Sequence, residues 1–296
     1  MRTRRTAAAA LAVLALTAVA ACGKDGSPGG DSSGPGTSYE VKKNVSITGS
    51  PTFDAAKKRG KLIIGAKADQ PNLGFEDVAS GTRSGFDIEI AKMVAADLGF
   101  SDKQVEFKTI PSTNRETAIA GGEVDYYVGT YTINDDRKKQ ISFAGPYFVA
   151  GQDLLVSKDN TAITGPEAVK GKQVCSATGS TSIKRIADQY GAKTTAFDTY
   201  SQCVDKLLDG SVDAVTTDDA ILKGYAAKYP DKLKVVGKPF SQEPYGIGLN
   251  KDDKALRDAI NNAIEAHEKN GDWKKAYDAT LGKSGANATP PQLVRY

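Results

Sequence analysis

The sequence predicts an α/β fold made of two similar lobes, each with a mostly parallel sheet flanked by helices. Short β-rich stretches alternate with helical apolar patterns along most of the chain, as in βαβ units. The chain also repeats itself, because GKLIIGAK at 60–67 is echoed by GKQVCSAT at 171–178. A second pattern, Gly-x-Val-Asp, recurs at 122–125 and 210–213. A coincidence of common residues is the alternative explanation.

Residues 1–21 have the features of a secretory signal peptide: a basic start, an apolar stretch and small residues before Cys22. The apolar stretch is too short for a comfortable bilayer span. Small residues directly before a cysteine resemble the bacterial lipobox, which implies cleavage before Cys22 and attachment of lipid to its sulfur. A plain signal peptide with an incidental cysteine is the alternative.

The segment 22–44 is expected to be a flexible linker, because most of it is rich in Gly, Ser and Pro and has little to bury. About 250 residues remain after it, enough for two compact lobes. The net charge of +3 is too small for electrostatics to indicate a nucleic-acid binder. We therefore expect a module anchored to the outside of the cell membrane.

The cysteines predict one disulfide. If Cys22 is lipidated, Cys175 and Cys203 remain as an even pair in an oxidising compartment. Their bond would close a loop of about 28 residues and contribute on the order of 3 kcal/mol by the chain-entropy model. Two free thiols, buried as small apolar residues, are the alternative.

The first half of the folded part alternates helices and strands. Thr52 is expected to cap its first helix and Gly60 to end it, and Ser112-Thr113-Asn114 is expected to cap its third. The expected helices are 53–59, 86–98 and one that includes Arg115 and ends at Gly121. The expected strands are 61–66, 105–110 and 124–128, followed by an apolar segment at 143–149.

The second half follows the same alternation. Its expected strands are 154–156, 171–177, 212–217, 233–236 and 245–249. Residues 178–182 are expected to open a helix that runs to about 190, and further helices are expected at 200–209, 252–270 and 272–281. The last strand is placed to return to the first lobe.

Polar side chains follow the strand at 124–128. Thr130, Thr132 and Arg137 come directly after it, and ligands of open α/β sheets lie beyond the carboxyl ends of strands. A guanidinium with threonine hydroxyls beside it suits a planar carboxylate. A surface arginine in a polar loop is the alternative.

The second lobe offers complementary groups. Ser180 and Thr181 lie between a strand and a helix, where backbone N–H groups favour an anion. Asp218 ends a strand and could meet an ammonium group. Together these residues predict a receptor for a zwitterion, with the carboxylate on Arg137, Thr132 and Thr181 and the ammonium on Asp218 and Thr130.

Five motifs resemble the family 3 extracellular solute-binding proteins, which deliver polar amino acids to ABC importers: SGFDIEIAKMVAADLG, GTYTINDDRKKQISFAGPYF, ATGSTS, GSVDAVTTDDA and YGIGL. The resemblance implies a type II periplasmic-binding-protein-like clamshell with crossing strands near 149–156 and 241–248. Lobe 1 would comprise 45–150 and 247–296, and lobe 2 would comprise 151–246. It also implies a monomer that binds through Arg137 and Asp218, works with a membrane permease and uses no cofactor.

Within that family, the chain most resembles actinobacterial glutamate-binding lipoproteins, on IGAKADQPNLGF, IPSTNRETAI and VCSATGSTS and on its cysteine pair. The resemblance implies that Lys67, Arg115 and Tyr200 contact the ligand's side chain. Two cations and a tyrosine fit a second carboxylate, so L-glutamate is expected, with aspartate, glutamine and asparagine as alternatives. A solvated lysine and a helix-surface arginine are the alternatives for the two cations. Polar residues stand at 70 and 72, where relatives place stacking aromatics, which leaves the role of Phe75 open.

An enzyme on the same fold, such as a dehydratase, is the other functional class. The single histidine, His267, is expected on the surface of the long helix near the C-terminus. The sequence has no Gly-x-Ser-x-Gly elbow and no Cys/His spacing typical of a metal site. We therefore expect no catalytic residues and no bound metal.

Overall fold

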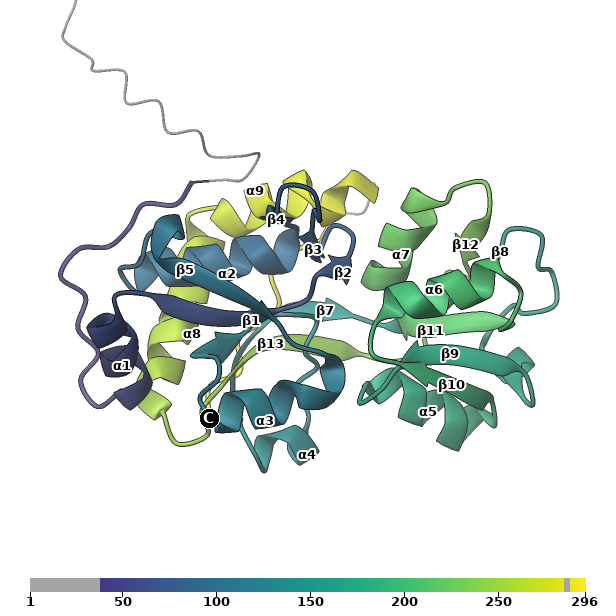
Figure 1. The fold of residues 1–296 in the computed structure, drawn as a ribbon, viewed down its shortest axis with the longest axis horizontal. Coiled ribbons are helices and arrows are strands. Elements are labelled where there is room, and N and C mark those ends of the chain that lie inside the picture. The colour runs from purple at the N-terminus through teal and green to yellow at the C-terminus, as the bar shows by residue number, and fades with distance from the viewer. Residues whose placement is uncertain (1–37, 285–287) are drawn as a thin grey trace, which may run out of the picture. The chain divides into compact units, whose positions relative to one another are not determined.

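The structure, a computed structural model, describes residues 38–284 and 288–296, which fall within one compact unit, Gly34–Tyr296. The expected signal peptide, Cys22 and the linker up to residue 37 lie outside the described residues. None of the helices in the described part is long and apolar enough to span a bilayer. The described residues form two five-stranded sheets and one three-stranded sheet (Figure 1).

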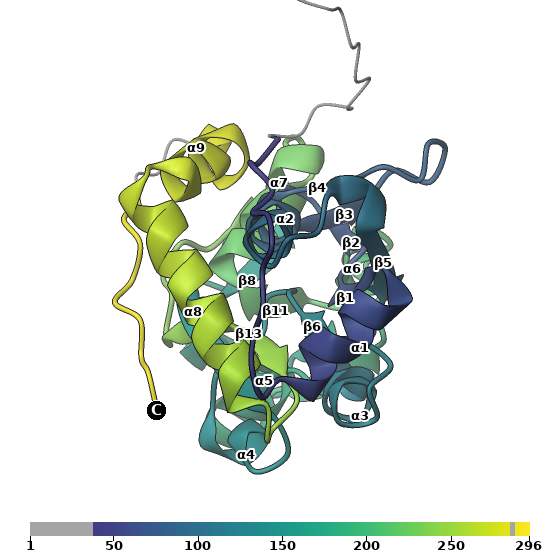
Figure 2. The same ribbon diagram turned by 90° about the vertical axis from the view of Figure 1, so that its left-hand side faces the viewer.

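The first sheet, with the helices packed on it, forms lobe 1. Its strand order is β5 (Val105–Thr109), β1 (Leu62–Ala66), β6 (Tyr126–Tyr127), β13 (Glu243–Leu249) and β7 (Ser142–Ala150). Its helices are α1 (Pro51–Arg59), α2 (Phe86–Asp97), α3 (Arg115–Ala120), α4 (Asp135–Lys138), α8 (Lys254–Lys269) and α9 (Asp272–Ala279). Figure 2 shows α8 and α1 on opposite sides of this sheet, where α8 packs on β7 and α1 on β1.

The second sheet forms lobe 2. Its strand order is β10 (Lys193–Phe197), β9 (Gln173–Ala177), β11 (Ala214–Asp218), β8 (Gln152–Ser157) and β12 (Leu233–Val235). Its helices are α5 (Thr181–Tyr190), α6 (Tyr200–Leu208) and α7 (Asp219–Lys228). The small sheet joins β2 (Asp69–Gln70), β3 (Gly74–Glu76) and β4 (Arg83–Ser84). Short 3-10 turns are η1 (Asp102–Gln104), η2 (Ser112–Asn114), η3 (Pro166–Val169) and η4 (Leu281–Ser284).

The two lobes repeat one plan, as the echoed motifs predict. The repeated strands are β1, β5 and β6 in lobe 1 and β9, β10 and β11 in lobe 2. The first four strands of the sheets correspond, as β5-β1-β6-β13 and β10-β9-β11-β8, and the fourth strand of each enters from the other lobe. The repeated aspartates also act alike: Asp125 accepts a hydrogen bond from the backbone of Ile63 in β1, and Asp213 accepts one from Gln173 in β9. Each carboxylate therefore ties the third strand of its repeat to the first.

Both sheets are mixed but mostly parallel, as expected, because a single strand in each runs against the other four. In lobe 1, β1 pairs in parallel with β5 and β6, whereas β13 runs antiparallel to β6 and β7. In lobe 2, β9 pairs in parallel with β10 and β11, whereas β8 runs antiparallel to β11 and β12. Because β8 and β13 enter their sheets from the other lobe, they run against the strands of the βαβ units.

The two segments that connect the lobes approach each other closely at Gly151. Only Gly151 separates β7 from β8. A Cβ atom on Gly151 would lie 2.7 Å from Cβ of Pro239 and 2.8 Å from the carbonyl oxygen of Ser241, which precede β13 on the other crossing segment. The two segments therefore meet at a residue that has no side chain.

Several local expectations need correction. Ser50, not Thr52, caps α1, because its hydroxyl accepts the N–H of Phe53 and donates to the buried carboxylate of Asp253. The strand expected at 124–128 pairs only over two residues, as β6. The small strands β2–β4, the half-exposed strand β10 and helix α7 were not expected, because their apolar patterns are short or interrupted, as by Gly224 in α7.

The ordered fold begins before residue 45, which corrects the boundary of the expected linker. Tyr39 is 8% exposed and its hydroxyl donates to Glu89 on α2 at 2.7 Å. His267 is buried rather than on the surface, because Tyr39 packs edge-on against its ring and Asp272 lies 2.9 Å from its Nδ1. The carboxylates of Asp97 and Asp272 raise the pKa of His267 despite its burial.

The predicted disulfide is confirmed. Cys175 on β9 and Cys203 on α6 are bonded, with their Cα atoms 5.4 Å apart, and both are fully buried. The bond spans 28 positions of sequence and fixes α6 to the sheet of lobe 2.

We predict that the double variant Cys175→Ala, Cys203→Ala is less stable than the wild type by on the order of 3 kcal/mol, because the unfolded chain regains the entropy of a long loop. Denaturant unfolding followed by circular dichroism measures this difference. The reduced wild type should be destabilised in the same way. Equal stability of the oxidised wild type and the double variant would show that the bond adds nothing to the fold.

Candidate functional site

Lys67 lies buried at the carboxyl end of β1. It is 4% exposed, and its Nζ donates to Oγ of Ser112 at 2.7 Å. Burial, and next the charge of Arg115, lower the pKa of Lys67 to about 7. Ser112 belongs to η2, and its hydroxyl is a partner of Lys67. Of the expected cap Ser112-Thr113-Asn114, Asn114 stands at the N-cap position of α3 but makes no side-chain capping bond. Lys67 is thus a desolvated cation that lacks a carboxylate in direct contact among the described residues.

Arg115 begins α3 directly after η2, and it is 3% exposed. Its Nε donates to the carbonyl oxygen of Ser112 at 3.1 Å. Its guanidinium carbon lies 4.2 Å from the ring centroid of Tyr131, a distance at which the aromatic face attracts a cation. The helix-surface alternative is therefore wrong for Arg115, as the solvated alternative is for Lys67.

Arg137 lies on α4, whose N-terminus is capped by Asn134. Its guanidinium carbon lies 4.8 Å from the ring centroid of Tyr131, so one aromatic ring faces two arginines. Its Nη1 donates to the carbonyl oxygen of Thr132 at 2.7 Å, and its Nε lies 3.2 Å from a carboxylate oxygen of Glu116. Burial, and next the charge of Arg115, lower the pKa of Arg137 to about 10.

The two arginines also contact lobe 2. Nη2 of Arg115 and Nη2 of Arg137 lie 3.4 Å and 3.3 Å from the carbonyl oxygen of Gly179, which precedes α5. A single carbonyl oxygen can satisfy only part of two guanidinium groups. The structure therefore gathers three buried cations at the face where lobe 1 meets lobe 2.

Thr130 adopts a left-handed conformation, with φ of 46°, beyond the end of β6. Its N–H donates to Asp87 at 2.9 Å and its hydroxyl donates to Oε1 of Gln70 at 3.2 Å. Since that hydroxyl gives its one proton to Gln70, it can only accept from a ligand, as an ammonium requires. Burial raises the pKa of Asp87 to about 6, although Tyr147 and Thr130 donate to it.

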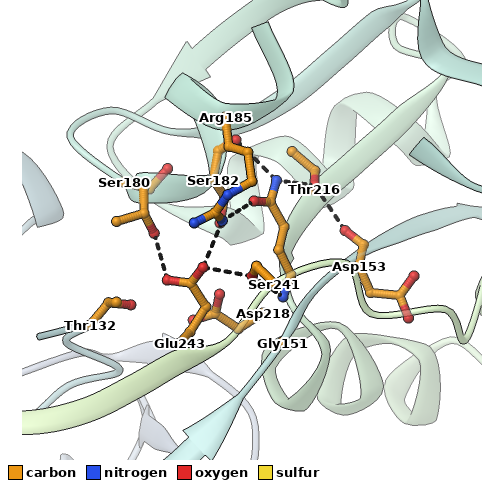
Figure 3. Close-up of polar contacts among 12 residues, drawn as sticks. Thr132, Gly151, Asp153, Ser180, Ser182, Arg185, Thr216, Asp218, Ser241 and Glu243 are labelled. Atoms are coloured by element: carbon orange, nitrogen blue, oxygen red, sulfur yellow. Dashed lines mark hydrogen bonds and ion pairs between the residues drawn. The ribbon is translucent and has the colours of Figure 1, made fainter. Parts of the chain in front are cut away.

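On lobe 2, the hydroxyls of Ser180 and Thr181 have protein partners. Ser180 caps α5 by accepting the N–H of Ile183. Thr181 donates to the carboxylate of Glu243 at 3.1 Å, so this hydroxyl also presents lone pairs to the site. Glu243 is fully buried and accepts from Arg185 at 2.6 Å and from Ser241 at 2.7 Å, as Figure 3 shows.

Asp218 ends β11 and is 4% exposed. One carboxylate oxygen accepts from Tyr245 at 2.7 Å, while the other is buried without a hydrogen-bond partner in the described part of the chain. Burial, and next the charge of Glu243, raise the pKa of Asp218 to about 7. Tyr200, 5% exposed, lies beside Asp218, which together with burial raises the pKa of this phenol to about 12.

The buried polar atoms around this site that lack partners among the described residues include Nε2 of Gln70, Oγ1 of Thr217 and Oδ1 of Asp218. A buried polar group without a partner is costly, and native proteins rarely retain one. The set comprises an amide donor, a hydroxyl and a carboxylate oxygen. A small molecule with both donors and acceptors would satisfy all three.

The structure brings most of the expected residues together and adds others. The buried residues among them are Lys67, Arg115, Thr130, Thr132 and Arg137 from lobe 1, and Tyr200 and Asp218 from lobe 2, where Thr181 is half-buried. Sequence reasoning missed the groups that support them: Gln70, Asp87, Ser112, Glu116, Tyr131 and Glu243. Phe75 lies elsewhere, in a groove with Pro71 and Lys228. No group of three or more His, Cys, Asp or Glu residues that could hold a metal occurs in the described part.

Three known proteins are similar to this chain over most of its length. The glutamate-binding protein GluB of Corynebacterium glutamicum is 38% identical over 260 residues, which cover 83% of this chain and 88% of the relative. The glutamine-binding protein GlnH of Bacillus subtilis is 35% identical over 257 residues, which cover 86% of this chain and 89% of the relative. Among solved structures, an ancestral arginine-binding protein bound to arginine is 40% identical with a TM-score of 0.70, covering 76% of this chain and 99% of that one.

The fold and the sequence agree on the family. The two-lobed α/β architecture is that of these amino-acid-binding structures. Residues 62–283 match the family described as bacterial extracellular solute-binding proteins, family 3. The chain therefore belongs to the family 3 bacterial extracellular solute-binding proteins.

Proposed function

We propose that this protein captures L-glutamate between its two lobes and delivers it to the permease of an ABC importer. The observation that carries the proposal is the arrangement of charge. Three buried cations face one buried aspartate that has an unsatisfied oxygen. Glutamate has two carboxylates and one ammonium, so it would compensate both kinds of charge.

The proposed roles follow the partners that each side chain still needs. The α-carboxylate is assigned to Arg137 and Thr132, and the ammonium to Asp218, with the lone pairs of Thr130 and Thr181. The side-chain carboxylate is assigned to Lys67 and Arg115, with Tyr200 beside it. Ser180 supports this site by shaping the N-terminus of α5.

Glutamate is favoured over related amino acids by the same charges. Glutamine would leave one buried cation without a carboxylate, and aspartate is shorter and would reach Lys67 and Arg115 less well. GluB is named for glutamate and GlnH for glutamine, so both ligands belong in the test. Isothermal titration against the twenty amino acids tests the proposal, and tight binding of a neutral or basic amino acid in preference to glutamate would refute it.

The cellular setting is part of the proposal. The protein would be a monomer on the outer face of the cytoplasmic membrane, held by lipid on Cys22 and a linker. The boundaries 45–150 and 247–296 for one lobe, and 151–246 for the other, would let the lobes close over the ligand as a hinge. Mass spectrometry of the protein extracted from membranes would detect the lipid.

We predict that Arg137→Ala loses about 3–5 kcal/mol of glutamate binding, because a desolvated carboxylate would be left without its partner. Titration calorimetry measures the loss. Arg59→Ala is the matched control, since Arg59 pairs with Asp125 near the start of β6, outside the site. Affinity like that of the wild type in Arg137→Ala would remove this residue from the site.

We predict that Lys67→Asp reverses the charge preference of the site. The variant should lose about 3–5 kcal/mol of glutamate binding, because two carboxylates would then face each other with only Arg115 left to compensate them, and it should gain affinity for lysine or arginine. A competition assay with acidic and basic amino acids measures the change. The control is Lys61→Asp, at the half-exposed Lys61 before β1. An unchanged ligand profile in Lys67→Asp would place Lys67 outside the pocket.

We predict that glutamate affinity is greatest near pH 7. The empty site has Asp218 and Lys67 each with a pKa of about 7. Pairing with the ammonium lowers the pKa of Asp218, so binding at pH 6 releases a proton and weakens as the pH falls. Pairing with a carboxylate raises the pKa of Lys67, so binding at pH 8 takes up a proton and weakens as the pH rises.

Calorimetry in buffers of different ionisation enthalpy counts these protons. Lys67→Met should lose the proton uptake at pH 8 and retain the proton release at pH 6. Binding without proton exchange at both pH values would contradict the assigned roles of Asp218 and Lys67.

A further inference from the structure

One contact between the lobes lies beside the proposed ligand shell. Asp69, in β2 of lobe 1, uses its carboxylate oxygen Oδ2 to accept from the backbone N–H of Ser201 at 3.1 Å and from the hydroxyl of Tyr225 at 3.1 Å. The same hydroxyl lies 2.6 Å from the backbone carbonyl oxygen of Asp69. Ser201 and Tyr225 belong to α6 and α7 of lobe 2.

A second observation shows how close the lobes come at this place. A Cβ atom on Gly224, in α7, would lie 2.6 Å from the carbonyl oxygen of Pro71, which follows β2. Glycine is therefore needed in this helix for the backbone of lobe 1 to approach it. Tyr225 is 2% exposed, so its hydroxyl is buried in the same contact.

Helix α6 does not need Asp69 as its N-terminal cap. The hydroxyl of Thr199 already caps α6 by accepting the N–H of Gln202. Asp69 therefore adds, from the other lobe, a negative charge at a helix N-terminus, where it is favourable. Tyr200, the first residue of α6, is a proposed ligand contact, and it precedes Ser201 in the chain.

We propose that Asp69 and Tyr225 are positioning residues that hold the lobes closed and place Tyr200 against the ligand. The contact among Asp69, Pro71, Ser201, Gly224 and Tyr225 is called the β2 latch. The ligand-facing part of this inference rests on the proposed function, because Tyr200 is assigned there. The closing part does not, because all members of the latch belong to the protein.

The latch has a consequence for affinity. Its hydrogen bonds form only where lobe 1 and lobe 2 meet, so they favour the closed arrangement whether or not a ligand is present. The apparent affinity of a ligand that requires closure rises with the fraction of protein that is already closed. Weakening the latch should therefore open the empty protein and speed the release of ligand.

The test uses the full-length protein with fluorophores on Lys58→Cys and Lys232→Cys, two exposed positions on lobe 1 and lobe 2. Single-molecule energy transfer then reports the closed fraction without ligand, and stopped flow reports the release of glutamate. Tyr225→Phe removes only the latch hydroxyl. Tyr229→Phe, at the C-terminal end of the same helix, is the matched control.

We expect Tyr225→Phe to close less often than the wild type when empty and to release glutamate roughly fivefold faster, the effect of one lost hydrogen bond. Tyr229→Phe should match the wild type in both measurements. Gly224→Ala should open the protein further, because its Cβ meets the backbone at Pro71. Alanine has a higher helix propensity than glycine, so a more open protein in this variant cannot be assigned to a weakened α7.

The results separate this inference from the proposed function. If Tyr225→Phe and Gly224→Ala close as often as the wild type and release glutamate at its rate, the latch is wrong while glutamate capture stands. If they open the empty protein but the wild type does not bind glutamate, the latch stands and the proposed ligand is wrong. Opening of Tyr229→Phe to the same extent would also overturn the latch, since any change in α7 would then suffice.

Discussion

The candidate site depends on holding the basic groups of Lys67, Arg115 and Arg137 in a buried place. Burial opposes their charged forms and lowers the pKa of Lys67 and of Arg137. Partial compensation comes from the face of Tyr131, the carboxylate of Glu116 and the carbonyl oxygen of Gly179. No carboxylate contacts Lys67 or Arg115 directly in the described part of the chain, so an anionic ligand can stabilise these two cations.

The repeated plan of the two lobes explains how opposite charges come to face each other. In both lobes the carboxyl ends of the parallel strands carry the polar groups, and the lobes meet at those ends. Lobe 1 places Lys67 after β1, whereas lobe 2 places Asp218 at the end of β11. Glu243 belongs to the crossing strand β13 and is paired with Arg185, whereas Asp218, among the described residues of this site, keeps a carboxylate oxygen without a partner. One fold, used twice, thus provides both halves of the proposed receptor for a zwitterion.

Much of this could be predicted from the sequence, because strand ends are local features. The positions of Lys67, Thr130, Arg137 and Asp218 follow from where β-rich stretches stop. The supporting groups could not be predicted in this way. Asp87 lies near the start of the largely buried helix α2 and Glu243 at the start of β13, and only the tertiary fold brings them to Thr130 and Thr181. Likewise, Ser50 caps α1 with help from Asp253, which is far away in sequence, so a local capping rule chose the neighbouring threonine.

The crossing at Gly151 also limits how the molecule can move. Because the two connecting segments touch there without an intervening side chain, they form one narrow pivot instead of two separate tethers. A narrow pivot permits rotation about a nearly fixed axis and resists sliding of one half past the other. In the proposed cycle of opening and closing, such a pivot would preserve the register between opposing binding groups without rearrangement of either sheet.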